Sequence, residues 1–201
     1  MIVSASYRTD IPAFYADWFA ARLDAGWAAV ASPYGGPPAR VPLRGPTLDG
    51  FVFWTRNAAP FLGVLDRLRA DGLPFVLQYT VTGYPRALEP HVPGRAAAVA
   101  AIHALAARFG PRVVVWRYDP VLLGAAQTPD WHRATFAGLA DQLAGAVDEV
   151  ALSFVTFYAK TRRNLARCGA GGWRAPDAAE RRALSADFAR LAAARGMGLS
   201  L

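Results

Sequence analysis

The sequence predicts an α/β protein in which about six or seven parallel strands form a complete or partial (β/α) barrel of the TIM type. Two observations lead to this prediction. Apolar segments of strand length alternate with helical segments along most of the 201 residues, and a helix supplies the crossover that parallel neighbours need. Several strands also carry polar residues on one face, whereas a doubly wound sheet needs two apolar faces. We therefore predict a single barrel domain over residues 1–201.

The first quarter of the chain combines regular elements with a long connection. A short strand over Ile2 to Ser6 leads into a helix capped by Thr9 or Asp10 and ended by Gly26. The expected apolar face of this helix consists of Phe14, Trp18, Phe19 and Leu23. A strand over 27–31 is followed by a Pro- and Gly-rich connection over 32–50, with a hairpin strand near 40–43. The absence of a helical period in this connection makes the expected barrel irregular.

From Phe51 onwards, strands and helices alternate regularly. Strands are expected over residues 51–55, 75–81, 113–118 and 150–155, and a last strand begins at 197. Helices are expected over 60–70, 95–109 and 130–146, and a final helix ends at Gly196. Thr128 is a predicted N-cap followed by a proline, and Asp177 with Glu180 has the spacing of a capping box. Leu184, Phe188 and Leu191 form the expected buried face of the final helix.

The polar faces of the strands predict where a site would lie. In the strand over 75–81, Gln78, Thr80 and Thr82 have one parity, whereas Leu77 and Tyr79 have the other. The first strand repeats this split with Ser4, Ser6, Arg8 and Asp10. Arg117 and Asp119 follow Val113 and Val115 on one face of a later strand, and Ser153 has a corresponding place in the next one. Polar residues toward the carboxyl ends of strands are typical of a barrel mouth that binds a ligand.

The predicted site therefore gathers residues from several strand ends. The candidate ligand-binding residues are Arg8, Thr55, Arg56, Asn57, Gln78, Thr80, Thr82, Arg117, Ser153 and Lys160. Four of them are cations, which favours a small partner carrying a phosphate or carboxylate. Asp10, Asp119 and Glu89 are the candidate general acids or bases. Each residue also has a structural interpretation, with Asp10 and Asn57 as helix caps and Arg117 with Asp119 as an ion pair.

Composition narrows the classes of partner, cofactor and compartment that this protein could have. The net charge is +7, and Lys160 is the only lysine among 22 cations, so a codon-biased genome accounts for the basic balance as well as a nucleic-acid partner does. His91, His103 and His132 lack metal-ligand spacing, so no metal site is expected from this chain alone. Cys168 is the single cysteine, which fits a reducing cytoplasm. Neither a secretory signal nor a transmembrane segment is expected, and hence no membrane partner.

Several blocks of sequence together resemble a known family. They are SASYRTDIP from Ser4, FWTRN from Phe53, QYTVTGY from Gln78, LEPHVP from Leu88, VWRYDPVLL from Val115 and SFVTFYAKTRRNL from Ser153. In this order, over about residues 2–165, they are similar to the signature blocks of the bacterial family called domain of unknown function 1848. The resemblance implies a β/α barrel like that of radical S-adenosylmethionine (SAM) enzymes, with SAM and an iron–sulfur cluster held by C-terminal cysteines as cofactors.

The chain departs from the family at its C-terminal end. It stops at Leu201 before such a cysteine cluster, and one thiolate cannot hold an iron–sulfur cluster. Tyr7 and Arg56 stand where the family pattern leads us to expect Arg and Lys. We therefore expect no cofactor from this chain alone and do not assign it to enzymes or non-enzymes.

Three hypotheses about function remain open. The first is a radical-SAM-like barrel with an anion-binding mouth, of uncharacterised activity and without its own cluster cysteines. The second is a cluster-free binding or hydrolytic barrel that uses the same mouth. The third is a nucleic-acid-binding module, which needs exposed aromatic side chains for stacking. Against it, Trp18, Trp54 and Trp116 fall in predicted helix and strand cores.

Overall fold

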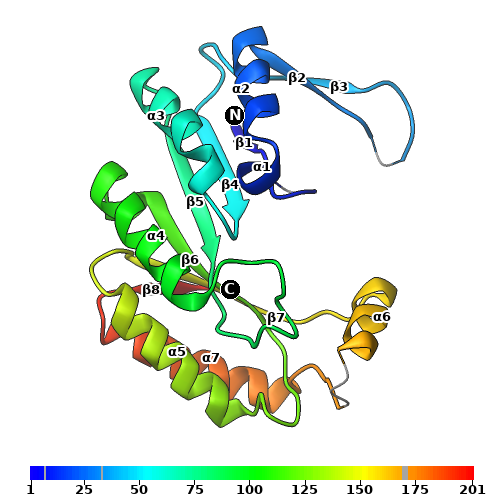
Figure 1. Cartoon of the computed structure of the whole chain (residues 1–201), viewed down its shortest axis with the longest axis vertical. Helices are drawn as coiled ribbons and strands as arrows, with labels where there is room; N and C mark the ends of the chain where they lie inside the picture. Colours follow the sequence, from blue (N-terminus) through cyan, green and yellow to red (C-terminus); the bar gives the residue numbers. More distant parts are fainter. Residues whose placement is uncertain (7, 33, 169–171) are drawn as a thin grey trace. The chain divides into compact units, whose positions relative to one another are not determined.

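The computed structural model of the chain describes residues 1–6, 8–32, 34–168 and 172–201. Tyr7, one of the departures from the family pattern, therefore lies outside the described residues. The fold is α/β, with a mostly parallel six-stranded sheet and a separate two-stranded sheet (Figure 1). The chain divides into two compact units, Met1–Gln78 and Tyr79–Leu201, which we call the N-terminal and C-terminal units.

The elements largely follow the sequence prediction. The strands are β1 Ile2–Ser4, β2 Trp27–Val30, β3 Ala39–Pro42, β4 Gly50–Thr55, β5 Phe75–Thr80, β6 Val114–Val121, β7 Glu149–Phe154 and β8 Gly198–Ser200. The helices are α1 Ile11–Phe14, α2 Ala16–Ala25, α3 Leu62–Ala70, α4 Arg95–Phe109, α5 Pro129–Leu143, α6 Ala159–Arg167 and α7 Ala178–Ala193. Single 3₁₀ turns over Ala59–Phe61 and Pro111–Val113 precede α3 and β6.

The strand order shows how the chain winds. The order in the large sheet is β1-β4-β5-β6-β7-β8, so each described strand follows the preceding one in a single direction. The pairs β1–β4, β6–β7 and β7–β8 are parallel. A doubly wound sheet would reverse its order at a switch point. The prediction of a parallel α/β sheet is confirmed, and its order is singly wound.

Aromatic side chains form the core of the N-terminal unit. The Phe19 ring from α2 lies 5.6 Å from that of Phe51 and 5.3 Å from that of Phe53, both on β4. Phe61 completes the cluster, with its ring centroid 4.9 Å from that of Phe53. Edge-to-face contacts of this kind add to the area that the rings bury. The cluster holds α2 and the start of α3 against β4.

The predicted first helix is interrupted, and part of its apolar face is not buried. Tyr15 leaves the helical conformation and separates α1 from α2. Phe14 is 73% exposed and Trp18 45% exposed, whereas Phe19 and Leu23 are buried as expected. The prediction for Phe14 and Trp18 was wrong: the break at Tyr15 separates Phe14 from the stripe of α2, and Trp18 lies about 100° from Phe19 around that helix, beside the buried stripe. The prediction that Gly26 ends α2 is confirmed, with φ at +76°.

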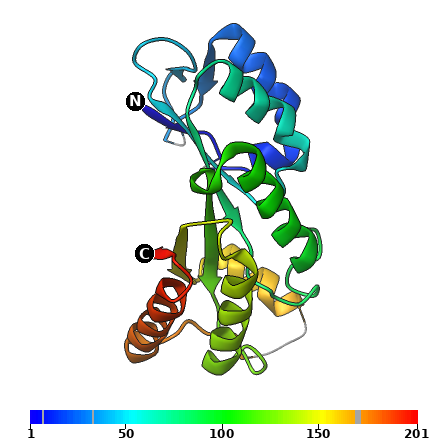
Figure 2. The ribbon, with the colours of Figure 1, turned by 90° about the vertical axis from the view of Figure 1, so that its left-hand side faces the viewer.

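The C-terminal unit buries its core between the strands and three helices. Trp116 and Tyr118 of β6 point toward α5, where the Phe136 ring lies 4.7 Å from that of Trp116 and 5.2 Å from that of Tyr118. Phe188 of α7 stacks on Phe136 with their centroids 4.4 Å apart. Figure 2 shows α5 and α7 lying side by side, in agreement with their direct packing. The opposite face of β6 and β7 carries the odd-numbered residues.

The ends of the helices in this unit match the predicted signals. Thr128 caps α5 by accepting a hydrogen bond from the Trp131 amide. Asp177 and Glu180 form the predicted capping box at the start of α7, where Leu184 and Phe188 are buried and Leu191 is half-buried. Helix α6 was not predicted, because its polar sequence AKTRRNLAR has no apolar period to indicate a helix. In the described part of the chain, no helix has the length and apolar character needed to cross a bilayer.

Candidate functional site

The first cluster of predicted site residues lies on β6 and β7. Arg117 and Asp119 form an ion pair, and the Ser153 hydroxyl donates a hydrogen bond to the other oxygen of Asp119. The Arg117 side chain is 16% exposed and that of Asp119 23% exposed. All three residues lie on the face opposite α5 and α7, since Tyr118 between them packs against the helices. The predicted sharing of one face by Arg117, Asp119 and Ser153 is therefore seen in the structure.

A second polar pair lies where β5 ends. The Thr82 hydroxyl donates to the Glu89 carboxylate at 2.8 Å, and Thr82 is only 2% exposed. The Val81 amide donates to the Arg117 carbonyl at 3.0 Å, so the segment that follows β5 runs directly alongside β6. Thr80 is half-buried on the same strand. The C-terminal unit thus places Thr80, Thr82, Glu89, Arg117, Asp119 and Ser153 at the ends of neighbouring segments.

Lys160 lies farther along the chain. It occupies the first turn of α6, which follows β7, and its side chain is exposed, as are those of Arg162 and Arg163. The Arg162 guanidinium lies 4.9 Å from the centroid of the Phe157 ring in a cation–π contact. The described residues of α6 include no acid, so this short helix presents positive charge only.

In the N-terminal unit, Asp10 joins the start of α1 to the end of β4. One carboxylate oxygen accepts from the Ala13 amide at 3.0 Å, and the other accepts from the Arg56 amide at 2.9 Å. The predicted N-cap is confirmed. Because both oxygens of Asp10 accept backbone N–H groups, this carboxylate has a structural task at the start of α1 and the end of β4.

The residues after β4 form a local turn. Thr55, which is 3% exposed, accepts from the Asn57 amide at 2.9 Å, and the Asn57 side chain accepts from the Ala59 amide at 3.1 Å. These bonds form an Asx turn before α3. The prediction of Asn57 as a helix N-cap was wrong, because the N-cap positions are Ala58 and Phe61 and neither has a side-chain cap. The unit therefore brings Asp10, Thr55, Arg56 and Asn57 together, and Gln78 lies half-buried on β5.

Arg8 lies elsewhere in the same unit. Its guanidinium donates to the Ala31 carbonyl at 2.9 Å, beside an apolar cavity between β1 and the hairpin β2–β3. The carbonyl that accepts from Arg8 belongs to the residue after β2, not to α1 or to the turn after β4, where Asp10 lies. Arg8 is thus directed to the hairpin and Asp10 to the end of β4, although only two positions separate them in the sequence.

Sequence patterns did not identify the polar network behind the first cluster. His132 is fully buried, and its Nε2 contacts the Leu122 carbonyl at 3.1 Å while its Nδ1 contacts the Tyr118 hydroxyl at 2.8 Å. Because a carbonyl only accepts, Nε2 carries the proton and Nδ1 accepts from Tyr118. Burial lowers the pKa of His132 from 6.5 to about 4 and raises the pKa of Tyr118 well above its usual value of 10. Neutral His132 therefore anchors α5 to the segment that follows the site strand.

Tyr84 extends this network toward the loop after β6. Its hydroxyl donates to the Pro120 carbonyl at 2.8 Å and accepts from the Leu122 amide at 2.8 Å. The Tyr84 ring stacks on Trp131 at 5.6 Å. These contacts fix the backbone immediately after Asp119. The signal in the sequence was the position of His132 within the predicted helix over 130–146, but only a structure shows that its ring is buried and which carbonyl it contacts.

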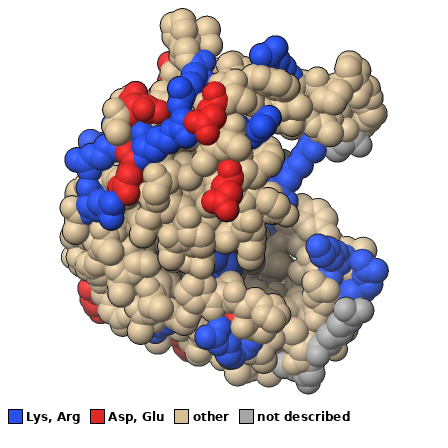
Figure 3. Space-filling model, turned by 45° about the horizontal axis from the view of Figure 1, so that its top comes forward, with Lys and Arg blue, Asp and Glu red and all other residues tan. Residues whose placement is uncertain are grey.

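The surface charges are unevenly distributed. On α2 and α3, Arg67 pairs with Asp24 at 2.6 Å and with Asp71 at 3.8 Å, and Figure 3 shows blue and red side chains lying together on one side of the molecule. Such pairs neutralise part of the net charge locally. Among the described residues, no three His, Cys, Asp or Glu side chains are grouped so as to hold a metal ion.

Comparison with known families identifies the chain. The sequence pattern of a family described as a domain of unknown function, DUF1848, matches residues 2–201. The chain belongs to the DUF1848 family. The resemblance inferred from the sequence blocks is thereby confirmed and extends over nearly the whole chain. A comparison with curated proteins finds no match.

The DUF1848 blocks coincide with the clusters described above. The block VWRYDPVLL covers β6 with Arg117 and Asp119, and QYTVTGY covers the end of β5 with Thr82 and Tyr84. The block SFVTFYAKTRRNL includes Ser153 and most of α6. In this DUF1848 chain, the residues that carried the resemblance are therefore those at strand ends and in the loops that follow them.

Proposed function

We propose that the C-terminal unit of this DUF1848 protein binds a small anionic ligand, with Arg117 as the anchor for a phosphate or carboxylate. The observation that carries the proposal is the meeting of Arg117, Asp119 and Ser153 on the sheet face opposite α5 and α7. A guanidinium matches a phosphate or carboxylate with paired N–H donors. In α/β proteins, ligands bind at the carboxyl ends of parallel strands.

The neighbours of Arg117 support this role. Asp119 receives the Ser153 hydroxyl and the guanidinium at the same time, which holds the guanidinium in one orientation. A binding group that is oriented before the ligand arrives loses less entropy on binding. In this proposal, Thr80 and Thr82 contribute hydroxyl groups, and Asp119 and Glu89 remain the candidates for proton transfer.

A thermal-shift measurement tests the proposal. Inorganic phosphate, phosphorylated sugars and small carboxylic acids are added to the full chain and to Arg117→Ala. The matched control is Arg112→Ala, because Arg112 precedes the same strand and forms an exposed ion pair with Asp148 at 3.3 Å. A ligand at about 100 times its dissociation constant stabilises the folded state by about 2.7 kcal/mol. We expect that stabilisation in the control and its loss in Arg117→Ala; equal shifts in both variants would refute the proposal.

The proposal includes the architecture of a partial (β/α) barrel. The singly wound strand order supports it, because successive right-handed crossovers in one direction place the helices on one face of a sheet. An open doubly wound sheet would reverse direction. A crystal structure that shows helices on both faces of the large sheet would refute it.

The likeness to radical SAM enzymes extends, in this proposal, to the barrel alone. An iron–sulfur cluster requires three or four thiolate ligands, and Cys168 is the single cysteine of the chain. The side chains present do not fit such a cluster. After anaerobic reconstitution with iron and sulfide, the chain should therefore not show the visible absorption of a stoichiometrically bound cluster. Stoichiometric cluster formation on this chain would contradict the cluster-free proposal.

A second candidate function uses α6. Lys160, Arg162 and Arg163 are exposed on a helix whose described residues include no acid. Such a surface suits the phosphate backbone of a nucleic acid, whose binding weakens steeply with salt. A gel shift with a generic RNA and DNA, with Lys160→Ala/Arg163→Ala against Arg112→Ala, tests it. Binding that is insensitive to salt and to the α6 variant would rule it out.

A further inference from the structure

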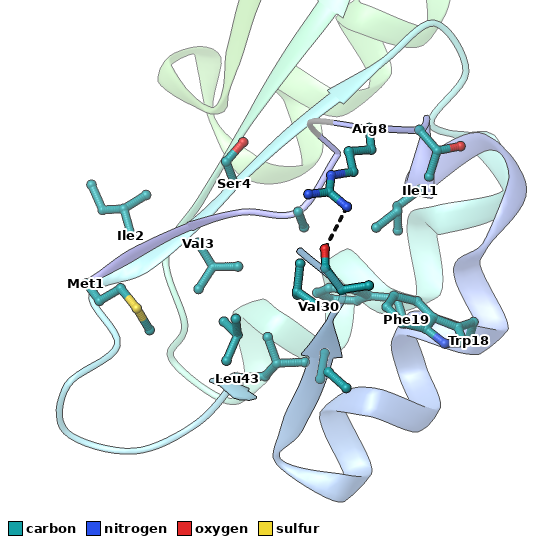
Figure 4. A pocket seen from close by; sticks show the side chains of 16 residues that line it. Met1, Ile2, Val3, Ser4, Arg8, Ile11, Trp18, Phe19, Val30 and Leu43 are labelled. Atoms are coloured by element: carbon teal, nitrogen blue, oxygen red, sulfur yellow. Dashed lines mark hydrogen bonds between the residues drawn. The ribbon is translucent and has the colours of Figure 1, made fainter. Parts of the chain in front are cut away.

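A cavity of about 600 Å³ lies within the N-terminal unit, between β1 and the hairpin β2–β3 (Figure 4). Residues 1–5 and 28–31 line it as two consecutive runs. Because alternate side chains of a strand point to opposite faces, consecutive residues line a cavity only where the strand presents its edge. The cavity is therefore bounded by two strand edges.

The edge of β1 offers backbone hydrogen-bonding groups to this cavity. The Met1 carbonyl accepts from the Asp49 amide at 2.9 Å, and the Ala5 amide donates to the Val52 carbonyl at 3.0 Å, so odd-numbered residues face β4. Alternate residues of a strand direct their N–H and C=O groups to opposite sides. The peptide groups of Ile2 and Ser4 consequently face the cavity side.

The edge of β2 is arranged in the same way. The Leu43 amide donates to the Gly26 carbonyl at 2.9 Å, and Ala28 pairs with Val41 in the antiparallel register. The even-numbered residues of β2 thus bond to β3, and Ala29 and Ala31 face outward. The Arg8 guanidinium already donates to the outward carbonyl of Ala31. Both walls therefore carry backbone N–H and C=O groups that are directed away from β4 and β3.

Charge and direction define what would fill this space. Arg8 is the only charged side chain among the described residues lining the cavity, and its donor is directed to a neutral carbonyl at 2.9 Å. It follows the carboxyl end of β1 and contacts the carboxyl end of β2. A strand that runs parallel to both would therefore end at Arg8 with its own carboxyl end. Apart from Ser4 and Thr9, the other residues that line the cavity are apolar, such as Val3, Phe19 and Leu43.

We propose that this edge cavity binds the C-terminal end of a partner polypeptide as an added β-strand, with apolar side chains and a free carboxylate held by Arg8. Addition of a strand to an exposed edge provides main-chain hydrogen bonds, and the neighbouring pockets select side chains. Five consecutive residues, β1 and one residue on each side of it, line the cavity, so about five residues of partner, at about 3.3 Å each, match its length. This site belongs to the N-terminal unit and is independent of the anion site at Arg117.

The probe is a synthetic library of hexapeptides composed of Ala, Val, Ile, Leu and Phe, each made with a free C-terminal carboxylate and as the amide. Binding to the full chain is measured by fluorescence polarisation. Arg8→Ala removes the charge, and Arg44→Ala is the control, since Arg44 pairs with Asp71 in the same unit. Ser4→Pro removes the outward N–H while the ladder to β4 uses other residues, and Ser4→Ala is its control.

We expect free-acid hexapeptides to bind at least about tenfold more tightly than their amides, a difference that Arg8→Ala abolishes and Arg44→Ala preserves. Ser4→Pro should abolish binding and Ser4→Ala should not. Three results would overturn the proposal: equal affinity of acids and amides, no binder in the whole library, or self-association of the chain that Ser4→Pro disrupts, which assigns the edge to a second copy. Circular dichroism of each variant shows that its secondary structure is retained.

Discussion

Acidification from pH 7 to pH 5 should destabilise the C-terminal unit through a single side chain, His132. The ring is fully buried, and burial lowers its pKa from 6.5 to about 4. In the unfolded chain the same ring binds a proton near pH 6.5. Since the folded-state pKa lies below the unfolded one, the stability associated with neutral His132 is present above pH 6.5 and is lost as the pH falls toward 4. The term becomes constant only well below pH 4, where the ring is protonated in both the folded and the unfolded state.

The size of this loss follows from the difference between the two pKa values. A shift of one unit corresponds to about 1.4 kcal/mol, so the unfolding free energy should fall by about 2 kcal/mol between pH 7 and pH 5 and by about 3 kcal/mol by pH 4. The pKa of Glu180 is lowered to about 2 by Arg174, and the pKa values of Asp141 and Asp187 are lowered by Arg195 and Arg133, so these three acids titrate below this window. The interval from pH 7 to pH 5 is therefore the one in which the contribution of His132 is measured.

Urea denaturation at pH 7, 6 and 5, followed by tryptophan fluorescence, measures the effect, and the ring proton resonances of His132 report its pKa directly. The His132→Gln variant keeps a donor for the Leu122 carbonyl and has no titrating ring, so its stability should change by less than about 0.5 kcal/mol over the same interval. His103→Gln, at an exposed ring that contacts the Gln142 carbonyl at 2.7 Å, is the matched control and should retain the wild-type dependence. A ring of His132 that titrates near pH 6.5 would refute the reasoning.

Three further predictions concern stability and can be checked by chemical denaturation. Phe19→Ala should destabilise the N-terminal unit by about 3–5 kcal/mol, because it leaves a cavity at the centre of the aromatic cluster; a loss below 1 kcal/mol would mean that the cluster is not a packed core. Gly50→Ala should reduce the yield of folded protein or lower the free energy of unfolding by several kcal/mol, on the order of a strained core substitution. The reason is that an added Cβ would lie 2.6 Å from the Pro74 carbonyl oxygen, at a φ of +154°. A neutral effect would show that β4 and Pro74 separate readily. Asp177→Ala should cost about 1 kcal/mol through loss of the capping box of α7, whereas Asp177→Asn should retain most of that stability.

Local signals explain why most elements were predictable. Gly26, Thr128 and Asp177 mark helix ends through backbone conformation or side-chain capping, and both effects act within a few residues. The parity of β6 also predicted correctly that Arg117 and Asp119 share a face away from Tyr118. Helix α6 escaped prediction because it has no apolar stripe, and the exposure of Phe14 escaped because the break at Tyr15 leaves no mark in the sequence period.

For the candidate site too, some features could be predicted from the sequence and others required the structure. Sequence indicated the residue types and their strand ends, and the family resemblance confirmed over residues 2–201 came from the same blocks. The sequence could not show that both carboxylate oxygens of Asp10 accept hydrogen bonds, from the amides of Ala13 and Arg56. Nor could it show that Arg8 donates to the Ala31 carbonyl. A residue's partner across tens of positions depends on the packing of whole elements, which no local pattern encodes.

By itself, the sequence determined the alternation of strands and helices, the capping residues, the polar parity of the strands and membership of the DUF1848 family. The tertiary structure alone decided that residues 1–5 and 28–31 line one cavity, that neutral His132 is held between Tyr118 and Leu122, and that Asp119 accepts from both Arg117 and Ser153. The physical reason is the distance along the sequence over which each interaction acts. Backbone propensity and capping act over one helical turn, whereas hydrogen bonds and burial between distant segments exist only after the hydrophobic core has brought those segments together.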